Sequence, residues 1–198
     1  MTENSRDRLA ERRGMERAVY PPSEDSGLLA QAALDVVDPN WLVLEVGTGS
    51  GWVAEQVGKK TGATVLGSDL NPVACEKARE RGVQSVRGNL LDPFDSDAFD
   101  AVLFNPPYLP TPEGMEWDDW MERALSGGKS GRDVIEPFLA DVGRVLTEDG
   151  IVLLLVSSLT DLDAVAEMAA AGGFSTSEVA DESYPAERLV VLQLRQRD

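Results

Sequence analysis

The chain has 198 residues, of which 42% are hydrophobic, and this is enough for one α/β domain with a buried core. Its 35 acidic residues outnumber its 18 lysines and arginines, so the formal net charge is −17, which disfavours a dedicated nucleic-acid-binding protein. One cysteine and no histidine exclude an internal disulfide and leave almost no ligands for a zinc site.

The acidic, lysine-poor composition resembles that of proteins adapted to high internal salt, where screening suppresses repulsion between like charges. An acidic face matched to a basic partner is the alternative. The N-terminus is charged and lacks an apolar signal region, and no apolar run approaches the roughly 20 residues of a membrane span. We therefore expect a soluble, cytoplasmic protein.

Residues 1–18 are charged and mixed in sign, and we expect a flexible N-terminal arm before a single domain over residues 19–198. A helix is predicted over residues 24–37, because apolar residues recur there at helical spacing. Ser23 is a favourable N-cap for this helix, and the two acidic residues that follow it suit the positive end of the helix dipole.

Strands and helices alternate over most of the remaining chain. Strands are predicted at residues 42–46, 63–68, 83–87, 99–104 and 151–156. Helices are predicted at residues 51–59, 71–81 and 133–147, and Thr160 is expected to cap another. Two final strands, 174–180 and 188–194, are typical of an antiparallel pair at one edge. This order predicts an α/β fold with a doubly wound, mostly parallel seven-stranded sheet, with strand 83–87 at an edge and ligands at the carboxyl ends.

A glycine-rich turn follows the first predicted strand. Gly47, Gly49 and Gly51 allow a tight turn and close approach of the backbone to a ligand. The turn lacks the Gly-Lys-Ser/Thr ending of a phosphate-binding loop. Glu45 lies two residues before the first glycine and suits a cationic ligand. A purely structural turn remains the alternative.

Polar residues also follow the second and third predicted strands. Asp69 lies about 18 residues after the glycine turn, where a carboxylate would meet a ribose diol in a doubly wound fold. Asn89 can meet the edge of an adenine, and Leu90 and Leu91 would flank the face of that ring. The alternatives are an exposed aspartate before a helix cap and an ordinary turn asparagine.

The fourth predicted strand ends in Asn105-Pro106-Pro107-Tyr108. The prolines cannot continue the sheet and leave a stiff backbone whose carbonyls are free to accept hydrogen bonds. Asn105 adds a carboxamide and Tyr108 adds an aromatic face. This corner suits a substrate whose reacting atom is an amide or amino nitrogen, and the alternative is an ordinary turn after a strand.

Several motifs in order resemble the HemK/PrmC group of protein glutamine methyltransferases. They are Val19-Tyr-Pro-Pro-Ser-Glu-Asp-Ser26, Leu44-Glu-Val-Gly-Thr-Gly-Ser-Gly51, Ser68-Asp-Leu-Asn-Pro72, Gly88-Asn-Leu90, Phe104-Asn-Pro-Pro-Tyr108 and Ser126-Gly-Gly-Lys-Ser-Gly-Arg132. The short chain is similar to the archaeal and eukaryotic branch. The resemblance implies a class I methyltransferase domain of Rossmann-like fold. It also implies that S-adenosylmethionine is used to methylate the glutamine side-chain amide in the Gly-Gly-Gln motif of class 1 release factors.

The resemblance also implies roles for individual residues. The implied cofactor-binding residues are Ser26, Glu45, Gly47, Gly49, Asp69, Asn89, Leu90 and Asn105. The implied substrate clamp is Asn105, Pro106, Pro107 and Tyr108, of which Asn105, Pro106 and Tyr108 would act in catalysis. No metal is implied in the site. A small zinc-binding activator protein is implied as a heterodimer partner, and we expect it to add a strand beside residues 83–87.

Other readings remain open. Adenine-N6 methylation of DNA or RNA uses the same four-residue clamp on a flipped base, although the charge and the lack of room for a target-recognition domain argue against it. Methylation of a lysine in another protein would suit the acidic surface, and a non-catalytic scaffold is a third possibility. Residues 109–132 carry apolar and aromatic side chains, including Met115 and Trp117, and predict either a mobile lid or a packed peripheral helix.

Overall fold

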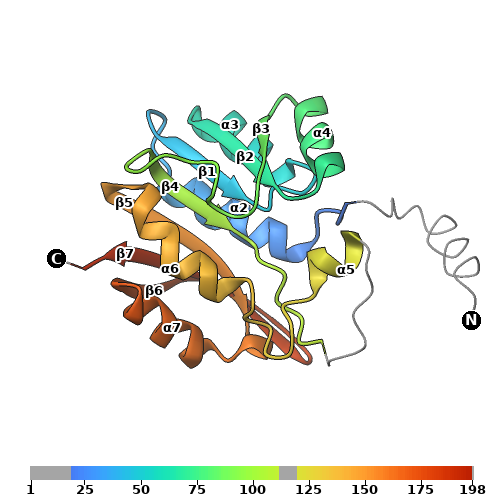
Figure 1. Cartoon of the computed structure of the whole chain (residues 1–198), viewed down its shortest axis with the longest axis vertical. Helices are drawn as coiled ribbons and strands as arrows, with labels where there is room; N and C mark the ends of the chain where they lie inside the picture. The colour runs from blue at the N-terminus through green and yellow to red at the C-terminus, as the bar shows by residue number, and fades with distance from the viewer. Residues whose placement is uncertain (1–18, 112–119, 198) are drawn as a thin grey trace, which may run out of the picture.

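The computed structural model describes residues 19–111 and 120–197, and the predicted arm over residues 1–18 lies outside these ranges. Seven strands of the described residues form one sheet in the order β3-β2-β1-β4-β5-β7-β6 (Figure 1). Their bounds are β1 Leu42–Val46, β2 Thr64–Asp69, β3 Gln84–Arg87, β4 Phe99–Phe104, β5 Leu146–Ser157, β6 Phe174–Tyr184 and β7 Glu187–Gln196. β7 alone runs in the direction opposite to the other six strands, so the predicted mostly parallel sheet and its terminal antiparallel pair are confirmed.

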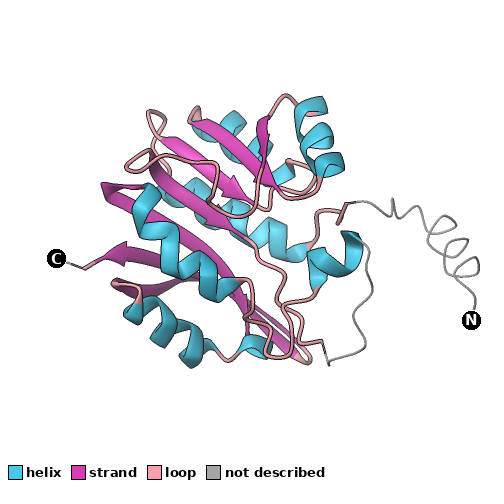
Figure 2. Cartoon of the chain, in the orientation of Figure 1, coloured by secondary structure: helices cyan, strands magenta, loops and turns pink. Residues whose placement is uncertain are grey.

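Helices cover both faces of the sheet (Figure 2). The described helices are α2 Glu24–Val36, α3 Trp52–Thr61, α4 Pro72–Glu80, α5 Trp120–Leu125, α6 Ile135–Val145 and α7 Leu162–Ala171. Side chains of the central strands alternate between two cores, as the pleat of a strand requires. On β4, Val102 and Phe104 pack in the core that contains α6 and α7, whereas Ala101 and Leu103 pack in the core that contains α2 and α3.

Of three expectations about where elements begin, one is confirmed in position and two were wrong. Ser23 is the N-cap residue of α2 as predicted, although its hydroxyl donates to Asp25 Oδ1 and accepts no hydrogen bond from the helix backbone. Thr160 lies in a short 3₁₀ turn, and Asp161 caps α7 by accepting from the amide of Ala164. Strand β5 begins at Leu146, well before the predicted start, because Leu146 pairs with Phe99 of β4.

The sheet has β3 at one edge and β6 at the other, so the predicted edge position of residues 83–87 is confirmed. The side chains of Gln84 and Arg87 on β3 are exposed. No helix within residues 19–111 or 120–197 is long and apolar enough to cross a membrane.

Candidate active site

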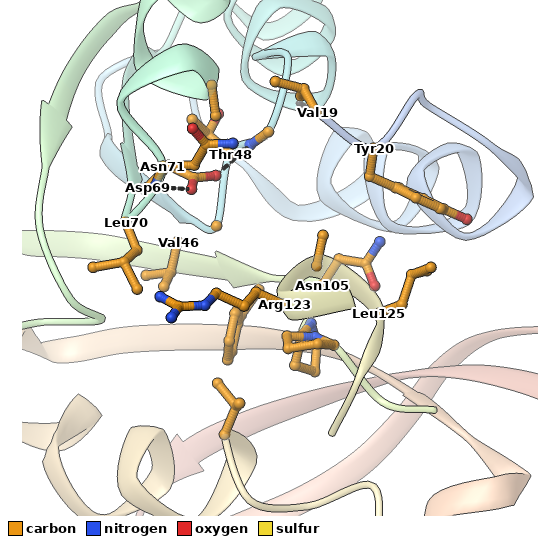
Figure 3. Close-up of a pocket in the computed structure, with 18 of the residues that line it drawn as sticks. Val19, Tyr20, Val46, Thr48, Asp69, Leu70, Asn71, Asn105, Arg123 and Leu125 are labelled. Carbon is orange, nitrogen blue, oxygen red and sulfur yellow. Dashed lines mark hydrogen bonds between the residues drawn. The ribbon is translucent and has the colours of Figure 1, made fainter. Parts of the chain in front are cut away.

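A cavity of about 720 Å³ opens at the carboxyl ends of β1, β2 and β4 (Figure 3). The turns after β1, β2, β3 and β4 line it, together with the start of α2 and helix α5. The cavity brings together all of the predicted site residues: Ser26, Glu45, Gly47, Gly49, Asp69, Asn89, Leu90, Asn105, Pro106, Pro107 and Tyr108. Residues spread over more than 80 positions of sequence therefore share one site.

The glycine turn after β1 is shaped by left-handed backbone conformations. Gly47 and Gly49 have φ of +63° and +53°, which side chains other than glycine rarely adopt. The amide of Gly49 donates to Oδ2 of Asp69 at 2.9 Å, so the turn is bound to the end of β2. Gly51 serves packing, because a Cβ there would lie 2.8 Å from Cα and Cβ of Ala78 in α4. The expectation that Gly51 admits a ligand is wrong, since its missing side chain makes room for a helix.

Glu45 lies at the cavity with its carboxyl group buried beneath the glycine turn. Its Oε2 accepts from Thr48 Oγ1 at 2.5 Å and from the amide of Ala54 at 3.0 Å. Burial raises the pKa of Glu45 to about 8, and the nearby charge of Asp69 adds to this rise. The two hydrogen bonds act in the opposite direction and lower the pKa. A cationic ligand would offset the burial and favour the ionised carboxylate.

Asp69 ends β2 and accepts hydrogen bonds from two turns that line the cavity. Its Oδ1 accepts from the amide of Asn71 at 2.8 Å, and its Oδ2 holds Gly49 (Figure 3). Burial raises the pKa of Asp69, and hydrogen bonds from the amides of Asn71, Gly49 and Leu70 act in the opposite direction. These backbone hydrogen bonds fix the orientation of the Asp69 carboxylate.

An apolar wall and a polar side chain lie beyond Asp69. Leu70 lines the cavity and is 42% exposed. Asn89 is exposed at the cavity, and Leu90 lines it with a φ of +46°. Leu91 packs in the core around α6 at 1% exposure, so the expectation that it flanks a bound ring is wrong.

The Asn105–Tyr108 segment leaves β4 at the opposite side of the cavity. The side-chain oxygen Oδ1 of Asn105 is buried and has no hydrogen-bond partner among the described residues. Such an atom is costly to bury without a donor, and so it marks a place where a donor from a ligand fits. Burial and the nearby carboxylates of Asp25 and Glu187 raise the pKa of the Tyr108 phenol far above its usual range. Tyr108 is therefore a neutral aromatic group at ordinary pH.

A second segment braces the backbone just after this clamp. The amide of Leu109 donates to the Leu125 carbonyl at 2.9 Å, and the amide of Gly127 donates to the Leu109 carbonyl at 3.0 Å. Gly131 approaches so closely that a Cβ on it would lie 2.5 Å from the carbonyl oxygen of Tyr108. Arg132 then donates from Nη1 to the Thr160 carbonyl at 2.5 Å, which ties the brace to the 3₁₀ turn that follows β5.

Asp25 is a site residue that the sequence analysis treated only as a first-turn acid. It is 4% exposed and lines the cavity. Its Oδ1 accepts from the amide of Ser26 at 2.6 Å, from the Ser26 hydroxyl at 3.2 Å and from the Ser23 hydroxyl at 2.6 Å. Asp25 thus orients Ser26 toward the cavity. No signal in the sequence distinguishes this role from a favourable helix start.

The segment predicted as a lid or a packed helix is described in part. Met115 and Trp117 lie outside the described residues, whereas Trp120 and Arg123 of α5 line the cavity. Figure 3 shows the amide of Asn105 on the side of the cavity near Tyr20 and Leu125. The side chain of Arg123 extends toward the other side, where Leu70 and Val46 lie. Whether residues 109–132 move stays a prediction.

The chain is similar to known methyltransferases in sequence and in structure. Residues 43–128 match the methyltransferase domain family. A protein assigned as an N5-glutamine methyltransferase in Methanocaldococcus jannaschii is 35% identical over 88% of this chain and 90% of its own length. The human methyltransferase HEMK2 is 32% identical over 72% of this chain and 73% of its own length. The solved structures include Mtq2 from E. cuniculi, in the Mtq2–Trm112 complex responsible for methylation of the termination factor eRF1. The match to it covers 91% of this chain and 99% of that chain, with a TM-score of 0.75 and 29% identity.

Proposed function

This chain belongs to the protein N5-glutamine methyltransferase family, and we propose that it methylates the side-chain amide of glutamine in the Gly-Gly-Gln motif of a class 1 peptide-chain release factor. The methyl donor is S-adenosylmethionine. Residues 19–198 would form the methyltransferase domain. The observation that carries the substrate assignment is the buried, unpartnered Oδ1 of Asn105 at the cavity, because it provides an acceptor for an amide N–H.

The cavity fits S-adenosylmethionine by the chemistry of its lining. Gly47 lines the cavity with a φ of +63°, a backbone conformation that suits glycine and bends the chain around the ligand site. Asp69 would accept from the ribose diol, and Glu45 would balance positive charge on the ligand. Asn89 and Leu90 would meet the adenine. When bound, S-adenosylmethionine supplies an electrophilic methyl group on a positively charged sulfur.

The clamp residues would prepare the amide nitrogen, which is a poor nucleophile because its lone pair is delocalised into the carbonyl. Asn105 Oδ1 and the carbonyl oxygen of Pro106 would each accept one N–H, which orients the nitrogen toward the methyl group and increases its electron density. Tyr108 stays protonated and would pack against the planar amide. The N–CH3 bond would form as the S–CH3 bond breaks, S-adenosylhomocysteine would leave, and the nitrogen would lose one proton to water. Catalysis would therefore rest on positioning and on electrostatics, with no strong base.

Transfer of labelled methyl groups tests the substrate assignment. The protein is incubated in high potassium chloride with labelled S-adenosylmethionine and one of three substrates: a class 1 release factor, its Gly-Gly-Gln→Gly-Gly-Ala variant, or duplex DNA. We expect label on the unmodified factor alone. Equal label on both factors would indicate another residue, such as a lysine, and label on DNA would indicate an adenine nitrogen. Either outcome would overturn the proposal.

The raised pKa of Glu45 predicts a pH-dependent affinity for the cofactor. Because the free carboxyl is protonated below about pH 8 and a cationic ligand favours its ionised form, the Kd should fall as the pH rises from about 6.5 to about 8.5. Calorimetric titrations across this range measure the effect. Glu45→Gln keeps an acceptor for Thr48 and Ala54 and should remove this part of the dependence. Titration of the ligand itself affects both proteins in the same way. If Kd therefore changed with pH equally in the wild type and in Glu45→Gln, the assignment of this dependence to Glu45 would be contradicted.

We further propose that a small zinc-binding activator binds along β3 as a heterodimer partner. The support is the exposed edge position of β3 and the Trm112 subunit in the related complex. An unpaired strand edge can accept a strand from another chain. The labelling experiment is therefore run with and without the activator. The net charge of −17 supports a halophilic enzyme, and high salt is used for that reason. The proposed substrate places its action in translation termination, in the cytoplasm.

A further inference from the structure

The charged groups around the cavity are strongly unbalanced. Four acidic side chains line it, those of Asp25, Glu45, Asp69 and Asp133. Arg123 is the only cation among the described residues that line it. None of the cofactor or clamp positions considered above includes this arginine. Its guanidinium group borders the same cavity as these carboxyl groups.

The placement of Arg123 favours the adenosine end of the site. Its side chain extends from α5 toward Leu70 and Val46, whereas the Asn105 amide lies on the other side of the cavity (Figure 3). Leu70 directly follows Asp69 and presents an apolar side chain that is 42% exposed. An exposed apolar wall beside an aspartate that faces a ribose suits the flat surface of a base.

The chemistry of the arginine matches that placement. A guanidinium is planar and stacks on aromatic rings, in which it differs from the compact ammonium of lysine. Cζ of Arg123 already lies 5.4 Å from the ring centre of Trp120, one turn earlier on α5. This contact holds the planar group beside the cavity, in an orientation set by the helix.

We propose that Arg123 stacks its guanidinium on the adenine ring of the methyl donor and so contributes to the affinity for every adenosine-containing ligand. This inference rests on the proposed cofactor site and does not depend on the identity of the methylated substrate. It makes α5, which directly follows the segment after the clamp, a part of the cofactor site.

Calorimetric titration of S-adenosylhomocysteine and of adenosine tests the proposal in the absence of any release factor. Arg123→Ala should raise both Kd values by a similar factor, about tenfold. Arg123→Lys should restore only part of the loss, because it returns the charge without the planar group. Lys60→Ala removes one exposed positive charge remote from the cavity lining and should leave both Kd values unchanged.

Each other outcome overturns the proposal in a distinct way. A loss confined to S-adenosylhomocysteine would show that Arg123 pairs with the carboxylate of its amino acid portion. Full rescue by lysine would show a charge effect without stacking. Unchanged binding of both ligands would remove Arg123 from the cofactor site. Because these titrations contain no release factor, they remain interpretable even if the release factor is not methylated.

Discussion

Replacement of Asn105 by alanine should lower kcat for release factor methylation by at least about a hundredfold and leave the Kd for S-adenosylmethionine largely unchanged. The reason is that Asn105 Oδ1 is buried without a partner and would receive its hydrogen bond from the substrate amide. Loss of one such oriented group typically costs about 10²–10³ in rate. Single-turnover methylation measures the rate, and calorimetry measures cofactor binding.

Asn40→Ala is the matched control for this experiment, because Asn40 lies in an exposed turn before β1 and does not line the cavity. Its kcat should equal that of the wild type. Turnover by Asn105→Ala at the wild-type rate would exclude the clamp role. A cofactor Kd that rises as steeply as kcat falls would instead assign Asn105 to cofactor binding alone.

The second large effect is expected at Gly131. Alanine at this position is strained by a φ of +75° and places Cβ 2.5 Å from the Tyr108 carbonyl oxygen and 3.0 Å from Cγ2 of Thr160. The backbone of the clamp must shift to relieve this contact. Misplacement by about 1 Å can cost up to about a hundredfold in rate, so kcat should fall by roughly tenfold to a hundredfold with little change in cofactor affinity.

Gly82→Ala separates backbone strain from displacement of the clamp. Gly82 has a φ of +85°, close to that of Gly131, and nothing lies within 4 Å of a Cβ added there. Both variants should lose stability, by about 1–2 kcal/mol, in thermal unfolding. Only Gly131→Ala should lose kcat. Equal kcat values for the two variants would show that the brace does not position Tyr108.

Much of the fold could be predicted because its signals are local. The apolar run of β5, from Ile151 to Val156, is fully buried as expected, and the strands alternate with helices in the predicted order. The Asn71–Pro72 start of α4 also follows the expected chemistry, because the Asn71 side chain accepts from the amide of Val73. Most of the site residues could be collected into one cavity because they lie at or just after the carboxyl end of a parallel strand, whereas Ser26 lies in α2 and was placed by the resemblance alone.

The features that could not be predicted depend on contacts between distant parts of the chain. Gly51 is required by Ala78 in another helix, and Leu91 is drawn into the core beneath α6. Gly131 and Tyr108 lie in two loops that contact each other in the fold, and no periodic pattern in the sequence predicts this contact. Asp25 looks like any acid in a first helical turn until its three hydrogen bonds to Ser23 and Ser26 are seen. The role of Arg123 likewise depends on the direction in which α5 points.

Fragmentation mass spectrometry of the methylated release factor tests the central claim most directly, because it locates the transferred methyl group on one atom. The factor is treated with the enzyme, its activator and S-adenosylmethionine in high potassium chloride, then digested and sequenced. Methylation on the side-chain amide nitrogen of the glutamine in Gly-Gly-Gln is the predicted result. A methyl group on a lysine or on any other position of the factor, with that glutamine unmodified, would contradict the account.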